Sequence, residues 1–340
     1  MSSKALHAGK RKFSYKDVLR DLFPCKGDSA AEAIRKIIFM ISVITFSVCA
    51  YFVFDYFYEN YTNNKLYEPI QAKIPSFAEM LDDSPSNTIK SEEVLDCLKQ
   101  IISINDDVVG YIQIADKESS QNSPKLISYP IVQKKNEAER EFYLDHNIEK
   151  AENRAGSIFL DWRVNFGTQD QSDNVIIYGH EMKDGSMFGS LKKYYENYDF
   201  YGQHPCIELA TRYQISTYKI FGVFYADGGT DDSQFHYYNN IDFSDEENFF
   251  WYINEIKRRS FILNDVDMQY GDELLTLSTC ATGSYDDARF VVAARKVRNG
   301  EDKYAGTENN SRNPNPLMPD GWYQNHGGSY DRDAEFVPYT

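Results

Sequence analysis

The chain has few of the residues that bind metals or form disulfide frameworks. Its 340 residues include five scattered cysteines and six histidines, and no two cysteines stand as Cys-x-x-Cys. This excludes a disulfide-dense scaffold, and no histidine or cysteine cluster has the spacing of a zinc site. Asp227, Asp231 and Asp232 lie close enough in sequence for a calcium-binding loop, although solvated turn residues are the more ordinary interpretation. We therefore predict no metal and no cofactor.

Positive charge is scarce after the N-terminal segment. Residues 1–36 carry nine Lys and Arg against four Asp and Glu, a net charge of +5, whereas the remainder carries 27 against 48, a net charge of −21. Because an acidic domain cannot neutralise phosphates, nucleic acid is excluded as a partner. The length leaves room for one large domain or two small ones, with a sizeable core.

Charge is absent altogether from a run of 18 residues, Ile37 to Phe54, which follows two basic residues. At ~1.5 Å per residue, a helix of this length spans the hydrocarbon of a bilayer. A buried core helix and a cleaved signal peptide are the alternatives, but aromatic residues follow the run in place of a small-x-small cleavage site. We predict a transmembrane anchor over residues 37–58, with the N-terminus in the cytoplasm and the acidic portion outside the cell.

The segments beside this run are polar. Residues 1–36 are predicted to be a basic cytoplasmic tail, either disordered or with a short amphipathic helix on the membrane surface. Residues 59–87 are rich in Asn, Pro and Ser and are predicted to be a linker. Ser91 is expected to cap a helix that buries Leu98. Residues 299–340 hold few aliphatic side chains and are predicted to be a loosely ordered polar tail.

Between these flanks, short apolar and β-branched runs alternate with turn residues. Eight runs have the length and composition of strands. They cover residues 108–115, 126–132, 157–160, 175–178, 206–210, 214–225, 273–279 and 289–297. Helical patterns interrupt them at residues 187–197 and 244–259. The pattern predicts a mainly β protein, with a closed or nearly closed barrel in residues 106–298 that a stalk and helix in residues 59–105 precede.

Two of these strands end beside residues that can carry nucleophilic catalysis. One ends on Cys280, and the other is followed by His180, about a hundred residues upstream. A cysteine and a histidine at two strand ends are the parts of an activated thiol nucleophile. Arg289, at the start of the next strand, supplies a permanently charged donor. Taken singly, each residue has a structural alternative, and His146 and Arg295 are rivals for the last two roles.

These motifs resemble those of a known enzyme family. Thr-Leu-Ser-Thr-Cys at residues 276–280, followed by Arg289, is similar to the active-site signature of the sortases, the cysteine transpeptidases of Gram-positive cell surfaces. The segment from Ile177 to Phe188 resembles the histidine segment of class B sortases. The resemblance extends from about residue 106 to residue 297, more than half of the chain.

The resemblance implies a fold and a reaction. The fold is an eight-stranded sortase barrel with N-terminal helices and a long helix before the cysteine strand. Cys280 would attack a peptide carbonyl, His180 would transfer protons to and from the amines, and Arg289 would stabilise the oxyanion. Thr279 and Ser278 are expected to contact substrate. The expected substrates are secreted proteins with a C-terminal sorting signal of the Asn-Pro-x-Thr type and an amino group of a peptidoglycan precursor.

Other functions remain open at this stage. A hydrolase would use the same Cys280 and His180 but release the acyl group to water, and a non-catalytic surface module would keep the fold for binding. A pilus-polymerising sortase usually brings a lid and a different membrane arrangement, and the sequence contains neither. Cys97 and Cys206 could pair outside the cell, but nothing in the sequence requires it.

Overall fold

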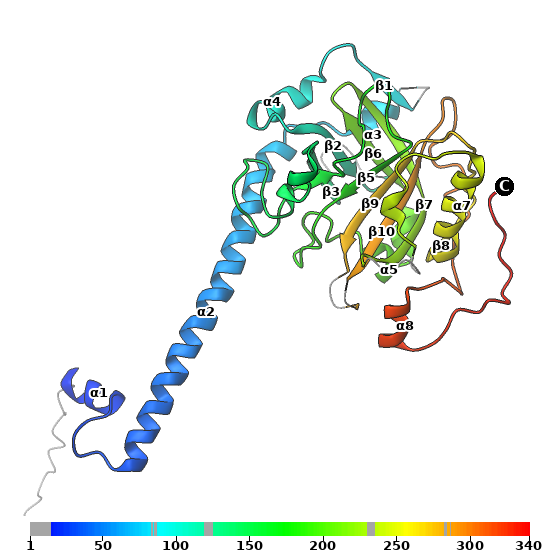
Figure 1. Cartoon of the computed structure of the whole chain (residues 1–340). Coiled ribbons are helices and arrows are strands. Elements are labelled where there is room, and N and C mark those ends of the chain that lie inside the picture. Colours follow the sequence, from blue (N-terminus) through cyan, green and yellow to red (C-terminus); the bar gives the residue numbers. More distant parts are fainter. Residues whose placement is uncertain are drawn as a thin grey trace, which may run out of the picture. The chain divides into compact units, whose positions relative to one another are not determined.

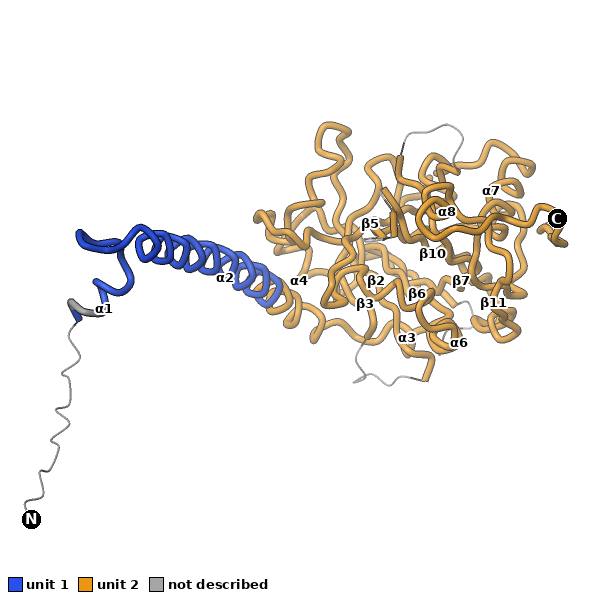
Figure 2. Tube along the Cα trace, turned by 90° about the horizontal axis from the view of Figure 1, so that it is seen from below, with its two compact units in different colours: residues 1–61 blue, residues 62–340 orange. Residues whose placement is uncertain are grey.

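A computed structural model of the chain describes residues 15–82, 84, 87–118, 125–229, 235–281, 284, 285 and 287–340. The chain divides into two units, residues 1–61 and residues 62–340 (Figure 2). The first contains α1 (Tyr15–Leu22) and most of α2 (Ala30–Gln71). The second contains all of the strands.

Helix α2 is long and apolar enough to cross a membrane. It runs over 42 residues, and none of its most apolar 18-residue stretch is buried. The helix continues past the predicted anchor, however, and Tyr67 and Ile70 near its end are buried in the core of the second unit. α3 (Phe77–Asp82) follows and buries Phe77. The prediction of a linker was wrong here, because a few apolar residues at helical spacing are embedded in a polar composition.

The second unit is built on a closed eight-stranded barrel, which confirms the predicted fold. Around the barrel the order is β7-β10-β9-β5-β4-β3-β2-β6, and β6 pairs back with β7. The β3–β4 and β5–β9 pairs are parallel, and the other pairs are antiparallel. A short strand, β1 (Thr88–Lys90), adds to β7. The eight barrel strands are β2 (Val108–Ile114), β3 (Ile127–Val132), β4 (Ile158–Leu160), β5 (Asn174–Tyr178), β6 (Cys206–Thr211), β7 (Gln214–Asp227), β9 (Leu274–Cys280) and β10 (Ala288–Lys296).

Strand β9 separates two layers of the core. Leu275 and Leu277 belong to the main apolar cluster, whereas Leu274 packs in a second cluster under α7 (Glu246–Arg259), as alternation along a strand requires. In Figure 1, α7 lies alongside β7, with β9 and β10 side by side next to it. Asp245 caps α7 by accepting a hydrogen bond from the Asn248 amide at 2.8 Å. This is the long helix that was predicted before the cysteine strand.

Two predicted helices differ from the structure. α4 (Asp96–Ile104) begins after Leu95, and Ser91 donates a hydrogen bond to the Glu93 carbonyl at 2.7 Å and caps no helix. In residues 187–197 only α5 (Lys193–Glu196) is helical. Met187 has a φ of 52°, a left-handed conformation that an α-helix cannot contain. The remaining short elements are α6 (Asp199–Gln203), η1 (Glu137–Glu139), η2 (Phe142–Leu144) and η3 (Tyr237–Asn239).

The C-terminal segment is packed along the barrel, contrary to the prediction of a loose tail. Its strand β11 (Ser311–Arg312) pairs with β8 (Ile262–Leu263), and α8 (Asp320–His326) follows. Glu301 bonds the buried side chains of Lys219 and Arg295 at 2.6 Å each. Polar composition was misleading, because this segment is held by hydrogen bonds, by the ion pairs of Glu301 and by single buried residues such as Met318.

Candidate active site

The strand register brings the two ends of the sequence motif together. In the antiparallel β9–β10 ladder, Cys280 is the direct partner of Arg289. Strand β5 pairs with β9 in parallel, with Tyr178 opposite Ser278, so His180 follows at the same end of the sheet. The Gly179 amide extends this ladder with a hydrogen bond to the Ser278 carbonyl at 3.1 Å. Three neighbouring strands thus place the thiol, the imidazole and the guanidinium at one end of the barrel.

Cys280 and His180 polarise each other. The hydrogen bond between them raises the pKa of His180 above its usual range, although burial opposes the shift. The same bond lowers the pKa of the Cys280 thiol, which burial opposes and the positive charge of Arg289 reinforces. Both shifts favour the thiolate–imidazolium pair over the neutral pair. The Leu144 carbonyl, 2.6 Å from His180 Nε2, fixes the ring so that its other nitrogen is left for the thiol.

Gly179 lies directly before His180 at the end of β5, and its φ is not positive. A Cβ atom at this position would lie 2.4 Å from Ile158 Cδ1 and 2.9 Å from Phe188 Cδ2. Glycine is therefore needed for close packing under the histidine.

Arg289 is half-buried and supported by main-chain groups. Its Nη1 donates to the carbonyls of Asp287 and Ala288 at 3.3 and 3.2 Å. The guanidinium lies over Gly228, where a Cβ would come within 2.7 Å of Arg289 Cζ. Within the described part of the chain, its Nε and Nη2 have no hydrogen-bond partner and remain available for an anionic oxygen. The rival, Arg295, is fully buried in ion pairs at the other end of the strand.

His146 holds the turn that orients the other histidine. Its Nδ1 lies 2.8 Å from the Phe142 carbonyl and 2.6 Å from the Asp145 carboxylate, and its ring stacks on Phe142 with centroids 4.0 Å apart. These contacts fix the segment that presents the Leu144 carbonyl to His180. The placement favours a structural part for His146.

Comparisons with known proteins agree on one family. A model of the Sortase domain matches residues 127–297. The sortase B of Listeria monocytogenes is 33% identical over 244 residues, 71% of this chain and 87% of that protein. The chain belongs to the sortases, in class B. Two solved structures support this: a Bacillus anthracis sortase B complex with AAEK1 (31% identity, 71% of this chain and 99% of that chain, TM-score 0.53) and a Staphylococcus aureus sortase B–substrate complex (27%, 71% and 98%, TM-score 0.54). The protein is thus a sortase cysteine transpeptidase.

The two residues that we expected to bind substrate in this sortase lie on opposite faces of β9. Ser278 shares the face of Cys280 and is buried, with its hydroxyl 2.6 Å from that of Tyr237 in η3. Thr279 faces the barrel side instead, and its buried hydroxyl has no partner within the described residues. Tyr237 was missed because no local motif marks it. The Leu144 carbonyl was missed because main-chain acceptors leave no signature in a sequence.

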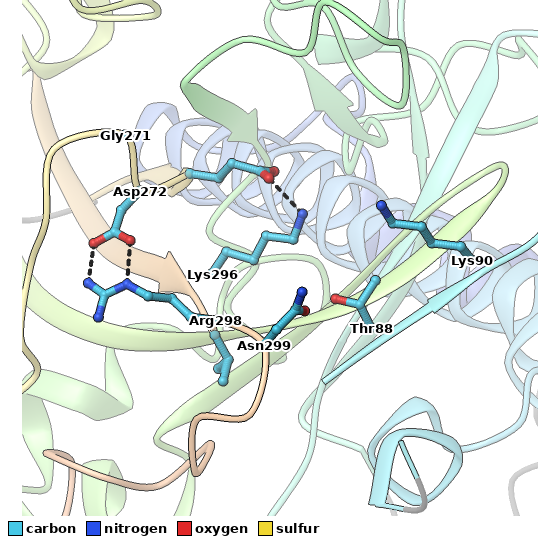
Figure 3. A pocket seen from close by; sticks show the side chains of 9 residues that line it. Thr88, Lys90, Gly271, Asp272, Lys296, Arg298 and Asn299 are labelled. Carbon is cyan, nitrogen blue, oxygen red and sulfur yellow. Dashed lines mark hydrogen bonds and ion pairs between the residues drawn. The ribbon is translucent and has the colours of Figure 1, made fainter. Parts of the chain in front are cut away.

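One cavity at the described surface of the sortase is remote from the thiol. It has a volume of about 520 Å³ and is lined by Lys296, Arg298 and Asp272, with Lys90 from β1 (Figure 3). These groups lie at the start of β9, about 20 Å along the strand from Cys280 at ~3.3 Å per residue. Arg298 bonds both oxygens of Asp272, and Lys296 bonds Glu273. The charges of Arg298, Asp272, Lys296 and Glu273 are therefore paired with one another.

No metal centre is found in the part of the sortase that the structure describes: no group of three His, Cys, Asp or Glu residues there is arranged to hold an ion. Of the acidic loop considered for calcium, Asp231 and Asp232 lie outside the described residues. Asp227 accepts a hydrogen bond from the Gly229 amide at 2.8 Å. The cysteines are free, and Cys206 is buried with its thiol 3.3 Å from the Lys303 carbonyl, so it is not paired with Cys97.

Proposed function

We propose that this sortase joins secreted proteins to an amino group of the cell wall, with Cys280 as nucleophile, His180 as acid and base, and Arg289 as oxyanion donor. One observation carries the proposal. The direct β9–β10 pairing sets a positive guanidinium beside a thiol whose pKa His180 already lowers. Nucleophile, proton donor and anion-stabilising group then converge on one reacting carbonyl.

The first half-reaction makes a thioester. The Cys280 thiolate attacks the carbonyl carbon of the peptide bond that follows threonine in the sorting signal, and negative charge develops on the carbonyl oxygen. Arg289 holds that charge with the Nε and Nη2 donors that no described group occupies. As the carbon–nitrogen bond breaks, the His180 imidazolium gives its proton to the departing amine. The raised pKa of His180 keeps that proton available near neutral pH.

The second half-reaction reverses the proton transfer. A neutral amine attacks the thioester, His180 accepts a proton from the nitrogen, and the thiolate of Cys280 leaves. The products are an amide between the two substrates and the starting thiolate–imidazolium pair. A thioester is more reactive toward an amine than the original amide, which makes the exchange of one amine for another practicable.

The substrates and location follow from the chemistry and from the anchor. We assign the sorting signal to the Asn-Pro-x-Thr type and the acceptor to an amino group of a peptidoglycan precursor. The family membership and the match to a substrate complex of a Staphylococcus aureus sortase B support this assignment. We place the barrel outside the cell, because α2 is long enough to span a bilayer and residues 1–36 are basic.

The test uses the full chain in detergent micelles, incubated with fluorogenic Asn-Pro-x-Thr and Leu-Pro-x-Thr peptides, with and without an amine acceptor. Mass spectrometry should detect cleavage after threonine and, with the amine, a ligated product. Cys280→Ala should abolish both products while circular dichroism shows an intact fold. Activity retained by Cys280→Ala would disprove the assignment, and cleavage without ligation at any amine concentration would favour a hydrolase.

A further inference from the structure

A smaller cavity lies on the opposite side of β9 from the Cys280 thiol. Its volume is about 260 Å³, and its wall includes Thr279 and Ala281, the two neighbours of Cys280 in the chain. Glu181, the residue after His180, also lines it. The negative charge of Glu181 acts on Cys280 and partly opposes the lowering of the thiol pKa by His180 and Arg289. The cavity therefore adjoins the catalytic strand ends without containing the catalytic side chains.

One polar group in this cavity lacks a partner. Thr279 is 2% exposed, and its hydroxyl makes no hydrogen bond with any described residue. An unsatisfied buried hydroxyl costs free energy, so sites of this kind are usually completed by a ligand or by ordered water. Because Thr279 lines the cavity, a group bound there can supply the missing hydrogen bond.

The rest of the lining favours a ligand with a cationic group on an aliphatic chain. Glu181, Glu196 and Tyr225 all line the cavity. Burial raises the pKa of Tyr225 to about 12, and Tyr195 and the two carboxylates add to the shift. Lys192 pairs with Glu181 at 3.2 Å, and among the described lining residues it is the one Lys or Arg beside the two carboxylates. Tyr225 and Trp322 supply aromatic surface, which attracts ammonium groups through the ring faces.

One wall of the cavity comes from outside the sortase domain. Trp322 and His326 belong to α8, beyond residues 127–297, and their rings stack with centroids 4.4 Å apart. Asn325 ties the helix to the Ser284 carbonyl at 3.0 Å. Gly321 lies so close to Tyr285 that a Cβ would be 2.6 Å from the ring. The C-terminal segment is therefore fitted to the loop that follows Cys280.

We propose that this cavity binds the ammonium group of an aliphatic amine and is the loading site for the acceptor. Glu196 and Glu181 balance the charge of the ammonium group, and Trp322 covers the aliphatic chain. The Thr279 hydroxyl accepts a hydrogen bond from the ammonium group. The proposal rests on the transpeptidase function assigned above. The amine is held there as a cation on the barrel side of β9. The ammonium releases one proton to water, and the neutral amine passes Ala281 to the thioester on the other side, where His180 accepts the proton that the attacking nitrogen gives up.

The first test measures binding without chemistry. The full-length Cys280→Ala protein in detergent micelles is titrated with 1,5-diaminopentane and with the neutral 1,5-pentanediol by isothermal titration calorimetry. Saturable binding is expected for the diamine alone. Glu196→Gln and Trp322→Leu should each weaken it, the former by about tenfold as for a charge-assisted hydrogen bond. Glu247→Gln, which removes an exposed carboxylate on α7, should leave the affinity unchanged. The proposal would be overturned if the diamine showed no saturable binding. It would also be overturned if Glu196→Gln and Trp322→Leu bound the diamine as tightly as the Cys280→Ala parent protein.

The second test asks which substrate the cavity serves. Pentyltrimethylammonium carries the same charge but cannot attack a thioester. In the wild-type protein it should compete with the diamine and raise the KM for the amine, and Glu196→Gln should lower the ratio of ligated to hydrolysed product. Competition with the sorting peptide would assign the cavity to the protein substrate and overturn the loading site. If the wild type cleaves no peptide, the proposed function fails, and the calorimetry still decides whether the cavity binds amines.

Discussion

Arg289 stands directly across the β9–β10 ladder from Cys280, and the same ladder sets Arg295 opposite Leu274 at its other end. The two arginines share a strand face but have different surroundings. Arg295 is fully buried and bonds Glu301, whereas Arg289 is half-buried with two donors unoccupied by described groups. The charge of Arg295 is already neutralised and can stabilise the fold. Only Arg289 is left to stabilise a transient anion.

Replacement of Arg289 should therefore affect the chemical step more than the fold. We expect Arg289→Ala to lower kcat by about 10²–10³-fold, as loss of an oxyanion donor does in other acyl-transfer enzymes. Arg289→Lys should recover only part of the rate, because an ammonium cannot reproduce the planar guanidinium. Peptide cleavage kinetics measure the effect. Arg312→Ala, an exposed change in β11, serves as the control, and a similar loss in that variant would refute the role.

The thiol–imidazole pair predicts a specific pH dependence of alkylation. Cys280 should react with iodoacetamide at lower pH than a free cysteine, because the hydrogen bond from His180 lowers its pKa from the usual value of 9.0. His180→Ala should move the midpoint of the rate profile upward, and at pH 7 each unit of that shift slows alkylation about tenfold. Peptide mapping separates Cys280 from the other cysteines, with Cys280→Ser as the blank. Identical profiles for wild type and His180→Ala would exclude the pair.

The same shifts predict a bell-shaped rate profile for peptide cleavage. The rising limb reports the lowered pKa of Cys280, because thiolate appears as the pH increases. The falling limb reports the raised pKa of His180, because the proton needed by the leaving amine is then lost. Steady-state kcat/KM measured from pH 5 to pH 10 should peak between the two values. If kcat/KM kept rising with pH and showed no falling limb up to pH 10, His180 would not be the group that supplies the proton.

Close packing under the histidine can be tested by one methyl group. Gly179→Ala places a Cβ 2.4 Å from Ile158 Cδ1 and 2.9 Å from Phe188 Cδ2, both in buried side chains, so we expect the backbone that carries His180 to shift. A displacement of about 1 Å can cost on the order of 10²-fold in rate, and we expect a loss of that order in kcat. Ile158→Val removes Cδ1 and should restore part of the activity in the double variant. Gly202→Ala is the matched control, since a Cβ there meets no atom within 4 Å. Full activity of Gly179→Ala would contradict the argument.

Most of the barrel could be predicted because its strands are apolar, β-branched and separated by turn residues. All eight strands were expected near their observed positions, and the cysteine and histidine stand at strand ends where the sequence motifs place them. The pairing of Cys280 with Arg289 could not be read from spacing alone, because the sequence does not show how many residues form the loop between β9 and β10. Register depends on contacts that only the folded sheet defines.

The features that sequence reasoning missed depend on few residues or on main-chain atoms. The end of α2 is polar in composition, yet Tyr67 attaches it to the core by packing edge-on against Tyr129, with ring centroids 5.2 Å apart. The carbonyl that orients His180 belongs to Leu144, whose side chain gives no hint of it. Thr279 and Ser278 are adjacent in the motif, but strand alternation sends them to opposite faces. Patterns of residue type predict elements better than they predict these single contacts.

One carboxylate of the polar C-terminal segment bonds two buried cations of the barrel, which makes this part of its attachment testable. Glu301 bonds Lys219 and Arg295, both fully buried, at 2.6 Å each. Burial alone would raise the pKa of Glu301, but hydrogen bonds from Arg295 and Lys219 outweigh it and lower the pKa to about 2. Glu301→Gln removes the carboxylate that pairs with Lys219 and leaves Arg295 with Asp267 and Asp272. Removal of one partner from a buried ion pair costs about 3–5 kcal/mol.

A lowered carboxylate pKa contributes stability above its unfolded value and loses it as the pH falls. Stability from Glu301 should therefore be complete at pH 7 and decline between pH 4.5 and about 2. Denaturant unfolding followed by tryptophan fluorescence reports on the unit of residues 62–340, because Trp162, Trp251 and Trp322 all lie in it. Glu301→Gln should unfold at lower denaturant than wild type at pH 7, and the difference should shrink toward pH 2. Glu308→Gln, an exposed neighbour, should behave as wild type. A pH-independent difference would mean that Glu301 acts through packing and not through its charge.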